Sequence, residues 1–339
     1  MMNRPSPRNN RGNVDFSNLT GCAGEACYWY QVGCMSGCKC AGWEEAIVTA
    51  GYYAKPEDFN CTTPKEPTVN SVRERTWNVH NRSAKGDWTK YFPWRAPGSA
   101  IPIDPCGVAT GFTPAGDKKR GKGPFGPSHY ENGAHGSTAL QPHAGVAPEV
   151  WTAGGTASVS WGQFVDHGGG YQYRLCKKGA AGEAATEACF QRTPLQFASP
   201  MQTIHYEDGS HADVKLAAVD LKEGTMPAGS TWRRNPVPAC NCDSGFTCGV
   251  DSSDEAKPYE AQSDPGGQCS TGLQFDAPSP KLFGFWVSND APHDAPLSIV
   301  SIVDELMVPD QKGEYLLSFR WDCEQTPQVW NSCADIAIQ

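Results

Sequence analysis

The sequence predicts an all-β protein, a two-sheet β-sandwich of the immunoglobulin or fibronectin-III type with long, disulfide-stapled loops. Short runs of alternating or β-branched apolar residues occur in the middle and at the end of the chain, as expected of half-buried strands. Apolar residues at helical spacing are nearly absent. The 36 glycines and 27 prolines among 339 residues indicate many turns and disfavour a helical bundle.

The expected strands follow from these runs in chain order. Ser158–Cys176 reads as a central hairpin, because two alternating runs meet there at a glycine turn. A short helix is expected at Trp43–Tyr53. The other expected strands are Gln202–His205, Asp213–Val219, Ser230–Trp232, Leu297–Val308, Tyr315–Trp321 and Cys333–Ile338.

The chain is expected to form one domain over residues 1–339, since this length can bury a full core. Two cysteine-rich loop blocks interrupt the strands, at about 20–62 and about 238–290. Zinc is the rival explanation of the first block. Its spacings, Cys34-x-x-x-Cys38 and Cys38-x-Cys40, differ from the paired C-x-x-C motifs of zinc ribbons, so disulfides are favoured.

Fifteen cysteines and three Asn-x-Ser/Thr sequons, at Asn18, Asn60 and Asn81, indicate an oxidising, secretory compartment. We therefore expect an extracellular glycoprotein, and a monomer. Met1–Asn13 is polar and lacks the apolar segment of a signal peptide, so this expectation requires a signal that was cleaved or that precedes the sequence. Two cysteine pairs lie close in sequence and are predicted to form disulfides, Cys176–Cys189 and Cys323–Cys333.

Charge and hydropathy restrict the partners. The formal net charge of −9 repels phosphate backbones, so nucleic acid is not an expected partner. No apolar run reaches membrane-spanning length, so a membrane is not expected either.

His167 lies at the turn inside Ser158–Cys176 and is followed by three glycines, Gly168–Gly170. Glycines let the backbone take positive φ and let a ligand approach the imidazole closely. By spacing alone, however, a lone histidine is more often structural or merely exposed than a metal ligand. Three more histidines lie in the loop-like stretch 114–148, where irregular spacing favours solvated residues over a metal site: His129, His135 and His143.

Six segments carry a family resemblance, in order along the whole chain. They are PSPRNN (5–10), CYWYQVGCMSGC (27–38), PWRAPGSAIPIDPCG (93–107), DHGGGYQYRLC (166–176), ACFQRTPLQF (188–197) and RWDCEQTPQVWNSCADI (320–336). The chain resembles the chitin-binding type-4 group, the lytic polysaccharide monooxygenases, and especially their algal and protist relatives. The resemblance implies a secreted copper enzyme that cleaves a crystalline polysaccharide, chitin or cellulose, by oxidation. Residues 240–290 match the family poorly.

In that family a histidine brace holds one copper ion through an N-terminal histidine and a second, internal histidine. His167 matches the second one. A Gln-x-Tyr or Gln-x-Phe pattern ahead of a late cysteine completes the family's site, and here it reads Gln328-Val329-Trp330 before Cys333. The resemblance implies that Gln328 donates a hydrogen bond to a bound oxygen species. Trp330 departs from the pattern, because an indole preserves an aromatic wall but supplies no phenol oxygen.

The N-terminal histidine of the brace is expected immediately upstream. Family members commonly begin His-Gly a few residues before a Pro-x-x-Arg-Asn stretch. Counting back from Pro7-Arg8-Asn9 places that dipeptide directly before Met1. With His167 as the only brace nitrogen ligand, copper binding would be weak.

Two other functions compete with this interpretation. A non-catalytic carbohydrate-binding or cell-wall protein would keep the sandwich and have an incomplete brace. A glycoside hydrolase is less favoured, because the carboxylates near the last strands lack the spacing expected of a facing acid and nucleophile. We expect these carboxylates to be solvated residues at strand ends. These carboxylates are Asp304, Glu305, Glu314 and Glu324. Four aromatic residues are candidates for stacking on sugar rings or for packing against disulfides: Tyr28, Trp29, Tyr30 and Trp94.

Overall fold

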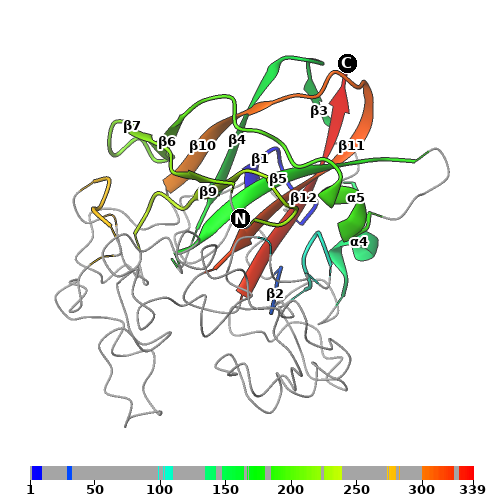
Figure 1. Ribbon diagram of the computed structural model, residues 1–339, viewed down its shortest axis with the longest axis horizontal. Coiled ribbons are helices and arrows are strands. Elements are labelled where there is room, and N and C mark those ends of the chain that lie inside the picture. The colour runs from blue at the N-terminus through cyan, green and yellow to red at the C-terminus, as the bar shows by residue number, and fades with distance from the viewer. Residues whose placement is uncertain are drawn as a thin grey trace, which may run out of the picture.

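The computed structural model places two β-sheets against each other, with short helices at one side (Figure 1). The residues that the structure describes are 2–9, 29–32, 98, 102, 104–109, 134–142, 147–163, 166, 168–179, 185–222, 225–238, 273, 275–279, 282, 300–323 and 328–339. This arrangement of strands in two sheets confirms the predicted all-β sandwich class.

The first sheet has the strand order β1-β4-β10-β6-β7, and every neighbouring pair in it is antiparallel. Its long central strand, β10, lies between β4 and β6. The bounds are β1 (Met2–Arg4), β4 (Thr156–Gly162), β6 (Met201–Tyr206), β7 (Val214–Ala217) and β10 (Val300–Met307).

The second sheet has the order β2-β12-β11-β5-β9-β8, and β3 pairs in parallel with the end of β12. Its three long strands, β5, β11 and β12, lie side by side at the centre of Figure 1. The bounds are β2 (Tyr30–Val32), β3 (Glu149–Trp151), β5 (Gly170–Lys177), β8 (Asp220–Leu221), β9 (Trp232–Arg234), β11 (Gly313–Asp322) and β12 (Gln328–Ile338).

Aromatic side chains from both sheets fill the space between them. Trp161 of β4 lies against Tyr171 of β5 and Phe319 of β11, with ring centroids 4.7 and 5.2 Å away. All three side chains are fully buried. Removing a ring of this size from water contributes roughly 2–3 kcal/mol, so such pairs hold the sheets together.

Two short helices flank the second sheet. They are α4 (Gly136–Ala139) and α5 (Glu187–Gln191). Thr186 caps α5, because its side chain accepts a hydrogen bond from the backbone N–H of Cys189. Neither described helix has the length and apolar content that crossing a membrane requires.

The predicted hairpin at Ser158–Cys176 is wrong in its pairing, although both of its runs are strands. β4 pairs with β1 and β10 in the first sheet, whereas β5 pairs with β11 and β9 in the second. The chain therefore crosses from one sheet to the other between them. The alternation of apolar and polar residues within a strand indicates that one face of the strand is buried. It does not indicate which other strand pairs with it.

The other strand predictions are confirmed with shifted ends. Leu297–Val308, Tyr315–Trp321 and Cys333–Ile338 correspond to β10, β11 and β12. The predicted Ser230–Trp232 strand overlaps β9 only at Trp232. The helix predicted at Trp43–Tyr53 lies outside the described residues. So do the first cysteine block, apart from 29–32, and the second block, apart from 238, 273, 275–279 and 282.

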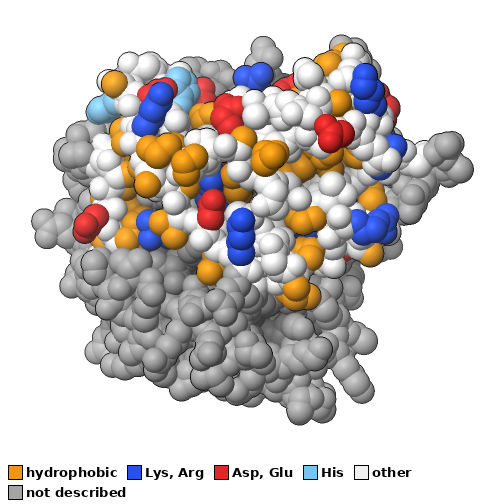
Figure 2. All heavy atoms as spheres, turned by 45° about the horizontal axis from the view of Figure 1, so that its top comes forward, with side chains coloured by type: hydrophobic (Ala, Val, Ile, Leu, Met, Phe, Trp, Pro, Cys, Tyr) orange, Lys and Arg blue, Asp and Glu red, His pale blue; other side chains and the backbone are white. Residues whose placement is uncertain are grey.

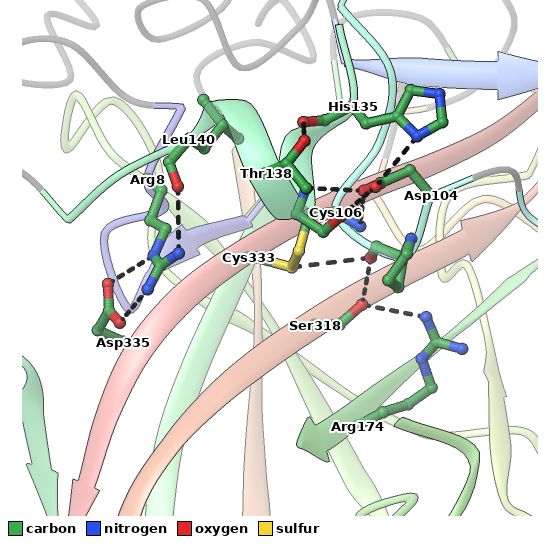
Figure 3. Close-up of a disulfide and its surroundings, with 12 residues drawn as sticks. Arg8, Asp104, Cys106, His135, Thr138, Leu140, Arg174, Ser318, Cys333 and Asp335 are labelled. Carbon is green, nitrogen blue, oxygen red and sulfur yellow. Dashed lines mark hydrogen bonds and ion pairs between the residues drawn. A yellow bond between two sulfur atoms is a disulfide. The ribbon is translucent and has the colours of Figure 1, made fainter. Parts of the chain in front are cut away.

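One of the two predicted disulfides is confirmed and the other is wrong. Cys176 and Cys189 are bonded, with Cα atoms 5.3 Å apart. Cys333 bonds instead to Cys106, with Cα atoms 5.1 Å apart, and so does not pair with Cys323 (Figure 3). Closeness in sequence failed here because β12 folds back beside the segment 104–107, which lies 227 residues earlier.

Asp304 lies in the core and not at a solvated strand end, so that prediction is also wrong. On β10 it points to the same side as the buried residues Ile302 and Leu306. The Tyr171 hydroxyl donates to Asp304 Oδ2 at 2.6 Å, and Arg233 Nη1 donates to Oδ1 at 2.9 Å. Burial raises the pKa of Asp304 to about 6, although the charge of Arg233 opposes this rise.

Candidate functional site

Trp330 and Trp321 lie opposite each other on β12 and β11, and their rings stack with centroids 6.3 Å apart. Trp321 is buried, whereas Trp330 is partly buried at the border of the core. The indole Nε1 of Trp321 also donates a hydrogen bond to the carbonyl oxygen of Gly168 at 2.8 Å. One side chain therefore links the ring of Trp330 to the backbone next to His167.

The described neighbours of His167 form a tightly bonded turn. The N–H of Gly168 donates to Asp166 Oδ1 at 2.8 Å, and Asn235 Nδ2 donates to the same oxygen at 2.9 Å. The backbone N–H of Asn235 donates to the carbonyl oxygen of Gly169 at 3.0 Å. Gly168 and Gly169 have φ of 64° and 79°, a region that glycine adopts without strain.

The first strand of the chain reaches the same region. Met2 pairs with Trp161 of β4, and its backbone N–H donates to Ser332 Oγ at 3.4 Å. Ser332 lies two residues after Trp330 and therefore on the same side of β12. The backbone of Met2 thus lies beside the strand that carries Trp330.

A buried ion pair lies on the other side of β11. Arg320 Nε donates to Asp322 Oδ1 at 2.6 Å, and the N–H of Gly98 donates to Asp322 Oδ2 at 2.8 Å. Burial raises the pKa of Asp322, although the charge of Arg320 opposes it. Asp322 pairs with Gly170 in the strand register, so this ion pair lies at the end of β11 that is next to the first residue of β5.

The structure places only part of the predicted site. Trp330 is described, and so is the backbone of Gln328, which pairs with Val32 of β2. The side chain of Gln328 lies outside the described residues, as does His167. The predicted constellation of these three residues therefore stays a prediction.

The predicted sugar-stacking residues have a mixed outcome. Trp29 is fully buried and packs with Ala109 and Leu140, so its ring has no surface to offer to a sugar and the packing alternative applies to this residue. The backbone of Tyr30 pairs with Trp330, and its side chain lies outside the described residues. Tyr28 and Trp94 also lie outside them.

Within the described ranges, no three histidine, cysteine or acidic side chains lie close enough together to hold a metal ion. His135 is half exposed, with its Nδ1 3.7 Å from Asp104 Oδ2. His129 and His143, the other two histidines of that loop, lie outside the described residues.

Sequence reasoning missed the residues that hold this turn: Asp166, Asn235 and Trp321. A local signal exists for Asp166, because an aspartate two residues before a glycine is typical of an Asx turn. The contact of Trp321 with Gly168 joins positions 153 residues apart and has no local signal.

On the face shown in Figure 2, apolar, basic and acidic side chains of the described residues are intermixed and do not form a patch of one charge. The large apolar side chains that are exposed are scattered over several elements. They are Val150, Met201, Val219, Met226 and Met307.

Comparison with known proteins agrees with the resemblance seen in the sequence. No family model matches the chain. A curated lytic polysaccharide monooxygenase, aasB of Emericella nidulans, is 25% identical over 197 residues, which make up 56% of this chain and 49% of the relative. The chain thus spans about half the length of the curated relative that it matches.

Solved structures of the same class are also found, at low similarity. A lytic polysaccharide monooxygenase AA15 from Thermobia domestica has a TM-score of 0.25 and 14% identity, over 56% of this chain and 62% of that one. An AA10 lytic polysaccharide monooxygenase from Streptomyces lividans has a TM-score of 0.27 and 9% identity, over 61% and 71% of the two chains. TM-scores in this range do not establish a common fold, and the similarity to the lytic polysaccharide monooxygenases is carried by the curated relative and the six segments.

Proposed function

We propose that the chain is a secreted, copper-dependent monooxygenase that cleaves a polysaccharide of the chitin or cellulose class by oxidation. One observation carries the proposal: the backbone beside His167, the start of β1 and the ring of Trp330 meet around Trp321 and Ser332. These are the three parts that a histidine brace with an aromatic wall would bring together. The similarity to a curated lytic polysaccharide monooxygenase supports it.

We place the proposed copper centre at this edge of the second sheet. His167 would supply one imidazole, and a histidine preceding Met1 would supply a second imidazole and an amino group. Nitrogen ligands suit copper in both oxidation states. When bound, copper would supply the activation of a dioxygen or peroxide species for attack on a C–H bond.

The chain's own residues would orient and shield this centre. Trp330 would form an aromatic wall that keeps water from one side of the centre, and its indole would offer no phenol oxygen as a ligand. Gln328 would donate a hydrogen bond to the oxygen species. The contacts of Gly168 and Gly169 would hold the backbone that follows His167 in the chain.

The disulfides of the chain support a secreted protein. Disulfides persist in oxidising compartments, and the described residues form two, Cys106–Cys333 and Cys176–Cys189.

Copper titration by calorimetry tests the proposal. Two proteins are compared, one that begins at Met1 and one with His-Gly added before it. We expect the extended protein to bind one copper ion at least about 100-fold more tightly, because the free terminal amine and imidazole chelate together. With a reductant, it should also release oxidised oligosaccharides from insoluble chitin or cellulose.

A non-catalytic carbohydrate-binding protein is the second candidate. Trp330 in place of the family's phenol or phenyl ring favours it. Equal and weak copper binding by both proteins, with retained binding to insoluble polysaccharide, would replace the monooxygenase proposal by this one.

A further inference from the structure

His205 of β6 has a carboxylate next to each of its two ring nitrogens. Its side chain lies on the face of β6 opposite to the buried residues Ile204 and Tyr206. Nδ1 is 2.7 Å from Oδ1 of Asp213, the residue before β7. Nε2 is 3.9 Å from Oε2 of Glu207, two residues further along the chain.

The contact with Asp213 determines which nitrogen of the ring is available. An ionised carboxylate only accepts hydrogen bonds, so Nδ1 donates and the neutral ring carries its lone pair on Nε2. This lone pair and Glu207 Oε2 are then two acceptors, and 3.9 Å is too long for a hydrogen bond between them. Two acceptors at this separation favour a cation that binds both.

The carboxylate of Glu207 is held in place by the neighbouring strands. Its Oε1 accepts a hydrogen bond from the hydroxyl of Ser301, a fully buried residue of β10. The Ser301 Oγ in turn accepts from Asn3 Nδ2 of β1 at 2.8 Å. Because these contacts use Oε1, Oε2 is left for His205.

We propose that His205 and Glu207 bind one divalent transition-metal ion of the zinc class, with Asp213 orienting the imidazole. Zinc bonds to imidazole nitrogen and carboxylate oxygen are about 2.0–2.2 Å long, so a tetrahedral ion would hold the two atoms about 3.4 Å apart. A side-chain movement of about 0.5 Å closes the present 3.9 Å to this value. A carboxylate on the other ring nitrogen is the usual outer partner of a metal-bound histidine.

The pair is accessible to ions and carries negative charge. The side chains of His205 and Glu207 are 44% and 23% exposed, so water can fill the remaining coordination positions. Two carboxylates beside one imidazole leave a net negative charge in either protonation state of the ring, which attracts cations. Lys215, on the same face of β7, lies opposite Thr203 and so one residue pair away.

This site is independent of the proposed function. It belongs to the first sheet, whereas Trp330 belongs to the second. Because Asp213 bonds to the ring and not to the ion, the protein supplies two ligands. We therefore expect weaker binding than in a centre with three or four protein ligands.

Zn²⁺ titration of the metal-free chain by calorimetry tests the proposal. His205→Ala is compared with His211→Ala, which removes another exposed imidazole from the same pair of strands and their turn. His205→Ala should bind one Zn²⁺ at least about tenfold more weakly than His211→Ala, because one of two ligands is gone. Equal titration curves for the two variants would overturn the proposal.

Two milder variants keep the test valid if His205→Ala fails to fold. Glu207→Gln removes the charge of the second ligand at the same size, and Asp213→Asn keeps an acceptor for Nδ1 without its charge. Each should weaken Zn²⁺ binding about tenfold relative to His211→Ala. Affinities equal to that control in both variants would also overturn the proposal.

Nitrogen resonances of the histidine rings identify the ligand directly. Zn²⁺ should shift the Nε2 resonance of His205 and leave that of His211 unchanged. The shift should require more Zn²⁺ as the pH is lowered, because protons compete with the metal for Nε2. A His205 resonance that does not respond to Zn²⁺ would contradict the assignment.

Discussion

Trp321 and Trp330 occupy facing positions of β11 and β12, with ring centroids 6.3 Å apart and ring planes 27° apart. The same Trp321 donates a hydrogen bond to Gly168, the residue after His167. The ring of Trp330 and the backbone of Gly168 are therefore both in contact with the side chain of Trp321, although these residues are far apart in sequence.

Substitution of Trp330 tests the aromatic wall. In the protein extended by His-Gly, Trp330→Tyr introduces a phenol oxygen and should change the electron paramagnetic resonance spectrum of bound Cu²⁺, whereas Trp330→Phe should not. Both rings retain stacking on Trp321, so stability should fall by less than about 1.5 kcal/mol. Identical spectra for both variants would place residue 330 away from the metal.

Removal of the His167 imidazole should abolish tight copper binding. In the extended protein, His167→Ala should weaken binding by at least about 100-fold in a calorimetric titration, because the brace loses one of its nitrogen ligands. His211→Ala is the control, since His211 is exposed and lies beside Tyr206 at the β6–β7 turn. Equal copper affinity in the two variants would exclude His167 as a ligand.

The two disulfides should differ in their contribution to stability. Cys106–Cys333 closes a separation of 227 residues, and Cys176–Cys189 one of 13. By loop-closure entropy, replacing both cysteines with serine should cost about 5 kcal/mol for the first pair and about 3 kcal/mol for the second. Denaturant unfolding measures both values, and a larger loss for the shorter loop would show that native contacts outweigh chain entropy.

Asp304 should make stability fall as the pH rises. Burial raises its pKa in the folded protein to about 6, above the value of about 3.9 in an unfolded chain. The folded state therefore binds this proton more tightly, and its contribution is fully present below about pH 4 and lost by about pH 6. The groups that face Asp304 are Tyr171 and Arg233, with the charge of Asp220 nearby.

Asp304→Asn removes this titration. Relative to the unmutated protein, the variant should gain up to about 3 kcal/mol in free energy of unfolding between pH 4 and pH 6.5. Denaturant titrations at several pH values give the difference. A gain in the opposite direction would mean that the ion pair with Arg233 outweighs burial and lowers the pKa.

Asp335 should behave in the opposite way. Burial alone would raise its pKa, but hydrogen bonds from Arg8 and Lys178 outweigh this and lower it. Arg8 donates to both carboxylate oxygens, at 2.7 and 2.6 Å, and to the carbonyl oxygen of Leu140 at 3.1 Å. The stabilisation is present above about pH 4 and is lost as the pH falls through the lowered folded value.

Arg8→Ala should therefore cost about 2–3 kcal/mol at pH 7, and the cost should shrink as the pH falls through the lowered folded pKa and the carboxyl takes up a proton. Lys178→Ala is the matched control, because it removes one single contact to the same carboxylate from a more exposed position. Its cost should be smaller at pH 7. Equal costs for the two variants would show that the bidentate geometry adds nothing.

Much of the fold could be predicted from the residues alone. Alternating Tyr171 and Tyr173 marked β5, and the β-branched run around Val300–Val303 marked β10, because a strand that buries one face repeats every two residues. The nearby pair Cys176 and Cys189 was predictable for a similar reason, since short loops close easily.

The sequence by itself also carried the resemblance to the lytic polysaccharide monooxygenases, through six ordered segments. Only the tertiary structure decided the partners. It placed β4 and β5 in different sheets, paired Cys333 with Cys106, buried Asp304 against Arg233, and brought Trp321 to Gly168. Each of these contacts joins positions that are distant in sequence. The periodicity of apolar residues along a strand indicates which face of the strand is buried, but not which residues that face is buried against.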